Sequence, residues 1–357
     1  MPFIIGMIVV IVYSGITFYI GWNMKLWLLS LGLHIPQYLF WPVLFIVAFS
    51  IILGRLHEQL RPLTVIGNYW MFVLQYGIAL CVIANIVVFF TPLSVRLVGS
   101  IVMLLLLILF VIGSYNAYSP VVRELTIEMD VKEPMTMVVA SDFHLGVLSH
   151  KKHLQKFVSL SNEQYPDVVL LVGDLVDDDP LWFVAKGMGE VMAQLKSTYG
   201  VYGVLGNHEY YGKKIPLLVE EMKQANVKIL LDETILIGER FYLTGQEDIT
   251  NKNRLPLQQL APEQKDYPWV VMNHTPNDLQ TPAELGVDLH LSGHTHLGQM
   301  WPNNLITRKM FEVDYGYKKK EDMHTLVSSG FGFWGPPTRI GSRSEMWVVH
   351  INSNGQQ

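Results

Sequence analysis

The hydrophobic positions of this chain are distributed in two different ways. Up to residue 118 they form four long uncharged runs, at 3–22, 38–54, 69–90 and 98–118. A helix needs about 20 apolar residues to cross a hydrocarbon layer about 30 Å thick. We therefore expect an all-α region of four transmembrane helices over residues 1–118.

From about residue 135 the apolar runs become short and alternate with polar segments. Unbroken runs that are typical of strands covered on both faces occur at 135–142, 168–174, 201–207, 269–274 and 287–294. Between the first three runs, residues 151–164 and 180–197 have the 3.6-residue apolar spacing of helices. This order predicts an α/β domain over 135–353, preceded by a linker over 119–134.

Charge separates the same two regions. The first 118 residues carry four basic and one acidic side chain, a net charge of +3, so the other residues carry −8 in a chain whose net charge is −5. An acidic domain disfavours duplex binding, so we expect no nucleic-acid partner. No charged side chain lies deep inside an apolar run, which argues against a transporter. The single cysteine, Cys81, excludes a disulfide within the chain and a thiolate metal site.

Basic side chains near the ends of the apolar runs predict the orientation in the membrane. The side that holds both termini would carry Arg55, Arg61, Arg123 and Lys132, and the opposite side would carry Lys25 and Arg96. Lys and Arg are enriched in cytoplasmic loops. We therefore expect an integral, multi-pass membrane protein whose α/β domain faces the cytoplasm.

Each of the five predicted strands ends in residue types that bind metal ions. The ends read SDFH, GDLVD, GNHE, NH and GHTH. Ligands of open α/β sheets bind in the crevice outside the carboxyl ends of the strands, so these side chains should converge there. Two buried histidines in one turn, His294 and His296, need partners, because an unpaired buried polar group costs roughly 1–3 kcal/mol. A metal ion supplies a partner, since histidine is the commonest metal ligand.

These five motifs, in this order over about residues 135–350, resemble the calcineurin-like metallophosphoesterase superfamily, and GHTHLGQ and SSGFGFWGPP are similar to its bacterial membrane-associated branch. The resemblance implies a two-sheet sandwich flanked by helices, with a dinuclear centre of two divalent metal ions. It implies that one metal ion is bound by Asp142, His144 and His296, the other by Asn207, His274 and His294, with Asp174 bridging both. It also implies that His208 is the catalytic imidazole, held by Asp177. That branch usually has glycine at the position of Leu297.

The same side chains support hydrolysis at phosphorus on chemical grounds. Two divalent ions about 3.5–4 Å apart can clamp the attacking and leaving oxygens of an in-line displacement and activate a hydroxide. A proton given by His208 to the leaving oxygen is worth about 10²–10⁴ in rate. Mixed His and carboxylate ligands suit Mn, Fe, Zn or Ni without selecting among them. We therefore expect a membrane-anchored, metal-dependent phosphoesterase that contacts membrane lipids and acts on a phosphodiester, phosphomonoester or pyrophosphate, lipid-linked substrates included.

Some interpretations stay open, the substrate and the oligomeric state among them. The alternative function is a membrane sensor or scaffold whose metal domain binds a phosphorylated ligand without turnover. His153, at the Lys-rich start of a helix, is expected in solvent, and His290 is expected in the core or beside the ligands. The basic, aromatic segment 304–320 and the aromatic segment 331–337 are interpreted either as a membrane-facing rim or lipid-substrate wall, or as ordinary solvated and packed loops.

Overall fold

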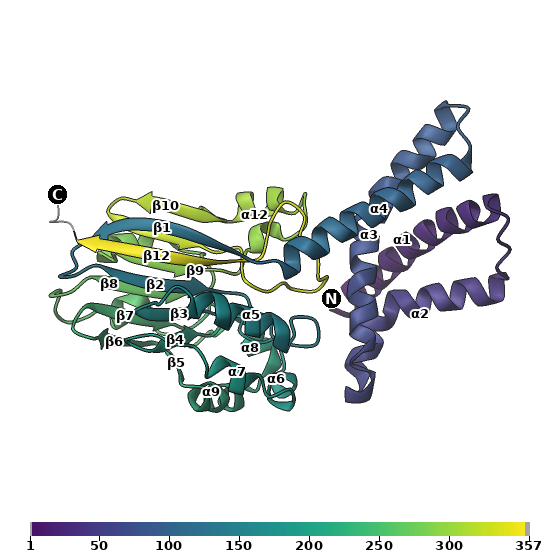
Figure 1. Cartoon of the computed structure of the whole chain (residues 1–357). Helices are drawn as coiled ribbons and strands as arrows, with labels where there is room; N and C mark the ends of the chain where they lie inside the picture. Colours follow the sequence, from purple (N-terminus) through teal and green to yellow (C-terminus); the bar gives the residue numbers. More distant parts are fainter. Residues whose placement is uncertain (1, 354–357) are drawn as a thin grey trace. The chain divides into compact units, whose positions relative to one another are not determined.

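The computed structural model describes residues 2–353, apart from the side chains of residues 2, 3 and 58. The chain forms two compact units (Figure 1). We name the first, Met1–Ser114 with Gly335–Thr338, the helical unit, and the second, Tyr115–Trp334 with Arg339–Gln357, the α/β unit. The two units are described separately.

The helical unit contains the four expected long helices, with a short 3-10 turn, η1 (Glu58–Leu60), between the second and third. They are α1 (Pro2–Ser30), α2 (Gln37–Leu56), α3 (Leu63–Phe90) and α4 (Val95–Tyr118), the last of which runs on into the α/β unit. All four are long and apolar enough to cross a membrane, with a mean hydropathy of 2.2 to 2.9. Small residues let α2 and α3 approach closely: a Cβ on Gly67 would lie 2.3 Å from the backbone nitrogen of Ile51.

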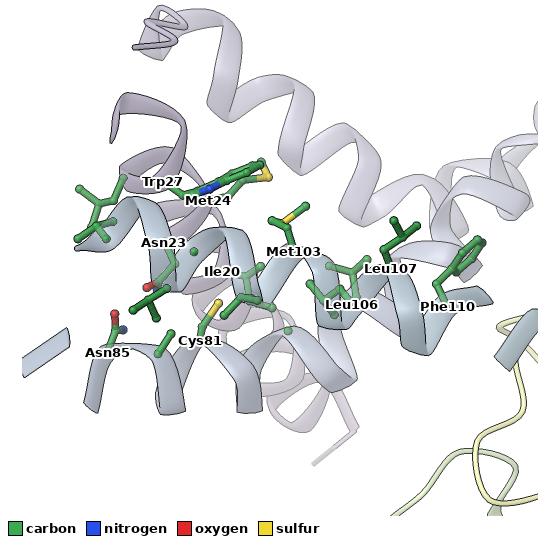
Figure 2. Close-up of a pocket in the computed structure, with 18 of the residues that line it drawn as sticks. Ile20, Asn23, Met24, Trp27, Cys81, Asn85, Met103, Leu106, Leu107 and Phe110 are labelled. Atoms are coloured by element: carbon green, nitrogen blue, oxygen red, sulfur yellow. The ribbon is translucent and has the colours of Figure 1, made fainter. Parts of the chain in front are cut away.

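Helices α1, α3 and α4 enclose a cavity of about 580 Å³ (Figure 2). Its walls are mainly apolar side chains, including those of Ile20, Leu106 and Phe110. The amides of Asn23 and Asn85 lie at one end of it (Figure 2). No Asp, Glu, Lys, Arg or His is among the residues that line it.

The α/β unit is a sandwich of two mixed six-stranded sheets, which confirms the predicted fold class (Figure 1). The first sheet has the order β1 (Val121–Met129), β12 (Glu345–Ser353), β2 (Met135–Ala140), β3 (Val168–Val172), β4 (Val201–Val204) and β5 (Val227–Ile229). The second has the order β10 (Gly316–Lys320), β11 (Met323–Val327), β9 (Leu289–Ser292), β8 (Trp269–Asn273), β7 (Phe241–Gln246) and β6 (Glu233–Ile237). Buried side chains such as Met137, Leu170 and Met272 form the core between the sheets.

Helices cover the outer faces of the sandwich. Apolar side chains of α5 (Lys151–Asn162), α6 (Leu181–Ala185), α7 (Met188–Met192) and α9 (Ile215–Gln224) join the core cluster of the first sheet. Side chains of α10 (Leu257–Leu260) and α11 (Gln280–Leu285) pack against the second sheet. The strands are therefore covered on both faces, which explains their unbroken apolar runs.

The structure departs from the expected elements at two places. The helix expected over 180–197 is divided into α6 and α7, because Gly187 between them has a left-handed φ of 57°. The interval 119–134, expected to be a linker, contains β1, which pairs in parallel with β12 over its whole length. The partner strand lies more than 200 residues downstream, so no local pattern could reveal that 121–129 belongs to the sheet.

Candidate metal centre

The predicted ligands follow the carboxyl ends of three neighbouring strands of the first sheet, β2, β3 and β4, and of two neighbouring strands of the second, β8 and β9. Backbone hydrogen bonds hold the first two of these loops side by side: the N–H of Asp142 donates to Gly173 O at 3.0 Å, and that of His144 to Asp174 O at 2.9 Å. The third loop begins α8 (Asn207–Gly212), and the fifth continues into the short turn η2 (His296–Gly298). The fold therefore brings all seven predicted ligands to one edge of the sandwich.

Several of these ligands have backbone conformations that ordinary residues avoid. Positive φ values of 45° to 69° occur at Asp142, His144, Asp174, His294 and His296. A left-handed conformation costs an L-residue roughly 1–2 kcal/mol. Such conformations persist only where the surrounding structure imposes them, and they cluster at functional sites. The backbone is thus shaped to direct these side chains toward each other.

Glycines next to the ligands allow the loops to come close. Gly173, with a φ of 79°, lies against the ring of His274, where a Cβ would be 2.6 Å from Nδ1. A Cβ on Gly206 would be 2.2 Å from the Oδ1 of Asp174. These distances leave no room for a side chain, which explains the glycine in the motifs GD and GN.

One group of side chains forms around the end of β2. Asp142, His144 and His296 offer ligand atoms that lie within 4.8 Å of one another. The Nε2 atoms of His144 and His296 are 3.1 Å apart, and His296 Nε2 is 3.3 Å from Asp142 Oδ1. All three residues are buried. This is the set that the sequence assigned to one metal ion.

A second group lies beside it, with Asp174 between the two. Asp174, His274 and His294 also offer ligand atoms within 4.8 Å of one another. Asp174 Oδ2 is 3.1 Å from His274 Nε2 and 3.6 Å from His144 Nε2, so this carboxylate reaches both groups. His294 Nδ1 is 2.8 Å from Asn207 Oδ1. The arrangement therefore has the composition expected of a second metal site that shares Asp174 with the first.

The hydrogen bonds of His274 leave one of its nitrogens facing a negative charge. Its Nδ1 lies 2.8 Å from Val172 O, a carbonyl that can only accept, so Nδ1 carries a proton. Its buried Nε2 lies 3.1 Å from Asp174 Oδ2. Burial lowers the pKa of His274, but the charges of Asp174 and Asp142 raise it well above the ordinary value, so this nitrogen is protonated when no metal ion is bound. A metal ion bound by the neutral ring and the carboxylate would take the place of that proton, so the residues present fit a metal ion.

Electrostatics of the two groups agree with that fit. Burial lowers the pKa of His144 and of His296 well below the ordinary value, so both rings are neutral and can donate a lone pair. Burial alone would raise the pKa of Asp174, but the charge of the protonated His274, its hydrogen bond and the neighbouring histidines together outweigh burial and lower this pKa far below the usual range. A fully buried carboxylate that stays ionised requires a neighbouring cation.

His208 lies at the rim of the centre, but its closest carboxylate is not the expected one. Its Nδ1 is 2.7 Å from Asp178 Oδ1 and 3.9 Å from Asp177 Oδ1. Asp178 has a φ of 59°, which turns the chain after Asp177 and brings the next carboxylate to the ring. Burial lowers the pKa of His208, but the hydrogen bond to Asp178 and the charge of Asp174 raise it to about 9. The sequence analysis missed Asp178.

Two further residues of the centre were also missed. Glu209 is buried and its carboxylate accepts backbone hydrogen bonds from Gly206 at 2.6 Å and Val176 at 3.0 Å, which ties the second and third loops together. Arg339 is fully buried and donates to the carbonyls of Ser329 and Gly332, in the loop that follows β11. Charged residues at otherwise apolar or glycine-rich positions, as in GNHE and PPTRIG, were the signal that could have revealed both.

Comparison with known proteins agrees with this geometry. Residues 135–298 match the model of the calcineurin-like phosphoesterase family. The chain is similar to an uncharacterized metallophosphoesterase of Campylobacter jejuni, with 31% identity over 271 residues that cover 72% of this chain and 71% of that protein. It is similar to one of Helicobacter pylori, with 32% identity over 256 residues that cover 68% and 67%. It is also similar to the transmembrane protein with metallophosphoesterase domain of Bos taurus, with 30% identity over 264 residues that cover 67% and 59%.

Proposed function

Since this chain belongs to the calcineurin-like phosphoesterase family, we propose that it is a membrane-anchored hydrolase of phosphoric esters that works with two divalent metal ions. The observation that carries the proposal is the buried pair of Asp174 and His274, in which a carboxylate oxygen and a ring nitrogen, both metal-ligand atoms, face each other at 3.1 Å. The pair lies within the convergence of all the predicted ligands. The four apolar helices that precede the α/β unit supply the anchor.

The proposed roles of the ligands follow from where they lie. Asp142, His144 and His296 would hold one metal ion, Asn207, His274 and His294 would hold the other, and Asp174 would bridge them. When bound, the two ions would neutralise the phosphate charge and lower the pKa of a water molecule to supply the nucleophile. Histidine, asparagine and carboxylate ligands suit Mn, Fe, Zn or Ni, and this ligand set does not select one of these metals.

His208 is proposed to act on the leaving group. Its ring is held by Asp178 at 2.7 Å, and the raised pKa of about 9 keeps it protonated at neutral pH. A protonated imidazole at the rim can donate a proton to the departing oxygen. Asp177, at 3.9 Å from the same nitrogen, would add to the negative charge that keeps the ring protonated.

Purification of the full chain in detergent micelles tests this proposal. We expect about two transition-metal ions per chain by elemental analysis, and hydrolysis of bis(p-nitrophenyl) phosphate or p-nitrophenyl phosphate. His208→Ala should keep the metal ions and lower kcat by about 10²–10⁴. His350→Ala is a matched control, because His350 pairs with Thr136 at the opposite edge of the same sheet and should behave as the unchanged chain.

The same measurements distinguish the proposed phosphoesterase from the alternative, a membrane sensor or scaffold that binds a phosphorylated ligand without turnover. A protein without bound metal that also stays inactive after addition of Mn would contradict the proposal. A protein that binds metal ions and inorganic phosphate but hydrolyses none of the test esters would instead support the sensor or scaffold.

A further inference from the structure

The segment 301–310 of the α/β unit, which we name the rim segment, exposes an unusual number of apolar side chains. It consists of Trp301, a short connection and α12 (Asn304–Met310). Exposed fractions are 55% for Trp301, 52% for Leu305, 58% for Ile306 and 68% for Met310. An exposed apolar cluster on a soluble surface usually marks an interaction site. A helix of seven residues is too short to cross a bilayer, so it can only lie on a surface.

The rim segment is hydrogen-bonded to the place where the last apolar helix ends. The final turn of α4, residues 115–118, belongs to the α/β unit, and only two residues separate it from β1. In that turn the Asn116 side chain donates to Arg339 O at 3.1 Å. Ile340, the next residue, accepts a hydrogen bond from the backbone N–H of Trp301 at 2.7 Å. A short chain of contacts within one unit thus connects the end of the candidate span to the rim segment.

Charge near the rim segment fits an anionic surface. The last turn of α12 carries the exposed cations Arg308 and Lys309. A pocket of about 350 Å³ beside the end of α4 is lined by Asn116 and Arg343, and by Arg123, whose charge is paired with Glu345. Exposed apolar residues next to Lys and Arg are the pattern of a helix that lies in the headgroup region of a bilayer.

The same segment borders the candidate metal centre. Phe311, which follows α12, has its ring 5.9 Å from that of His294. Trp334, with 55% of its surface exposed, has its ring 6.2 Å from that of His208. The side chain of Gln299 binds the backbone of Trp334 at 2.8 and 2.9 Å, which fixes this tryptophan next to the start of the rim segment. These aromatic side chains therefore border the centre at His208 and His294.

We propose that the rim segment inserts into the headgroup layer of the membrane that anchors the chain, so that the metal centre opens onto the lipid surface. The occupant of this surface is the bilayer, because the surface continues from the end of a membrane-spanning helix and combines apolar side chains with cations. If the rim segment docks in this way, phosphoesters at the lipid surface reach the centre before phosphoesters in solution. This consequence for the substrate rests on the proposed function. The docking rests on the membrane anchor of that proposal but not on its hydrolytic activity.

Depth-dependent fluorescence quenching in the full chain tests the docking without any turnover. In a Cys81→Ser background, Leu305→Cys is labelled with an environment-sensitive fluorophore and reconstituted in vesicles of phosphatidylcholine and phosphatidylglycerol. Tyr165→Cys is the matched control, because Tyr165 is 88% exposed and lies just beyond α5, away from the rim segment in sequence. We expect a nitroxide on the upper acyl chain to quench the label at 305 and to leave the label at 165 unchanged.

A second variant makes the test independent of the labelling site. Adding Ile306→Asp should lower the inserted fraction of the label at 305 roughly tenfold, because it replaces an exposed apolar side chain, which the proposal places in the headgroup layer, by a charge. Equal quenching at 305 and 165 would overturn the proposal. So would a blue-shifted but unquenched label at 305, which would mean that protein, such as a second copy of the chain, covers the rim segment. Quenching at 305 in a chain that hydrolyses no phosphoester would leave the docking intact and overturn the proposed function alone.

Discussion

Protonation of His153 should destabilise the α/β unit. His153 is buried in α5, with its Nε2 2.8 Å from Phe331 O and its ring against that of Phe331. Burial lowers its pKa to about 4, since the contact with that carbonyl is outweighed by desolvation and by the charges of His150, Arg339 and Lys156. The consequence reaches the candidate centre, because the next residue after Phe331, Gly332, donates its N–H to Asp142 O at 2.8 Å.

The size of the effect follows from the two pKa values. The folded value of about 4 lies below the ordinary 6.5, so the unfolded chain binds more protons between these limits. The free energy of unfolding is therefore not reduced by His153 above about pH 7, and it decreases as the pH falls from 7 toward 4. At pH 5 the loss amounts to about 2 kcal/mol. For a domain of this size that corresponds to a Tm shift of about 4–8 °C.

The assay compares the pH dependence of stability in two proteins. His153→Gln removes the titration and keeps an N–H that can donate to Phe331 O. The Tm of each protein is measured between pH 8 and pH 5 in detergent micelles. The drop should be smaller in His153→Gln by about 4–8 °C, whereas the control His34→Gln, at an exposed position of the helical unit, should follow the unchanged chain. Equal drops in all three proteins would refute the argument that His153 is buried in its neutral form.

Three further outcomes test the centre and the orientation. Asp174→Ala should lose both metal ions by elemental analysis while His208→Ala keeps them, because Asp174 reaches both ligand groups; loss of metal in both variants would contradict the role of His208. Gly206→Ala should lower metal content and cost about 1–3 kcal/mol of stability, since its Cβ would lie 2.2 Å from Asp174 Oδ1; a normal Tm and metal content would argue against that contact. In a Cys81→Ser background, Tyr165→Cys should resist a membrane-impermeant thiol reagent in intact cells and react after lysis, as expected for a cytoplasmic α/β unit; labelling before lysis would place the unit outside.

The strands of the site could be predicted because they carry their own local signal. Each is an unbroken apolar run that stops at a residue such as Asp142 or His274, and burial on both faces requires such a run. His153 shows that a second signal was present but overlooked. It lies four residues before Phe157 and next to Leu154, all on the buried face of α5, so helical periodicity alone places it in the core. The lysines around it led to the wrong expectation of a solvated side chain.

Other features depend on contacts that no local pattern contains. Pairing of β1 with β12 joins segments at the two ends of the α/β unit. The choice of Asp178 over Asp177 as the partner of His208 depends on one backbone rotation at Asp178. In both cases the sequence contains suitable residue types. A distant strand determines the pairing of β1, and the dihedral angle at Asp178 determines which aspartate contacts His208.

Leu297 shows what the geometry of the centre demands of the backbone. It has a φ of 50° and follows His296, whose φ is 51°, a conformation that favours glycine. With the five ligand residues that share this conformation, the strain is of the order of 5 kcal/mol or more, if each contributes about 1 kcal/mol. Domains of this kind have a net stability of about 5–15 kcal/mol. Strain of that size is tolerable only if the two sheets and the hydrogen bonds between the loops impose it. Binding of metal ions by the converged ligands would then offset part of the backbone strain, since it stabilises only the folded state.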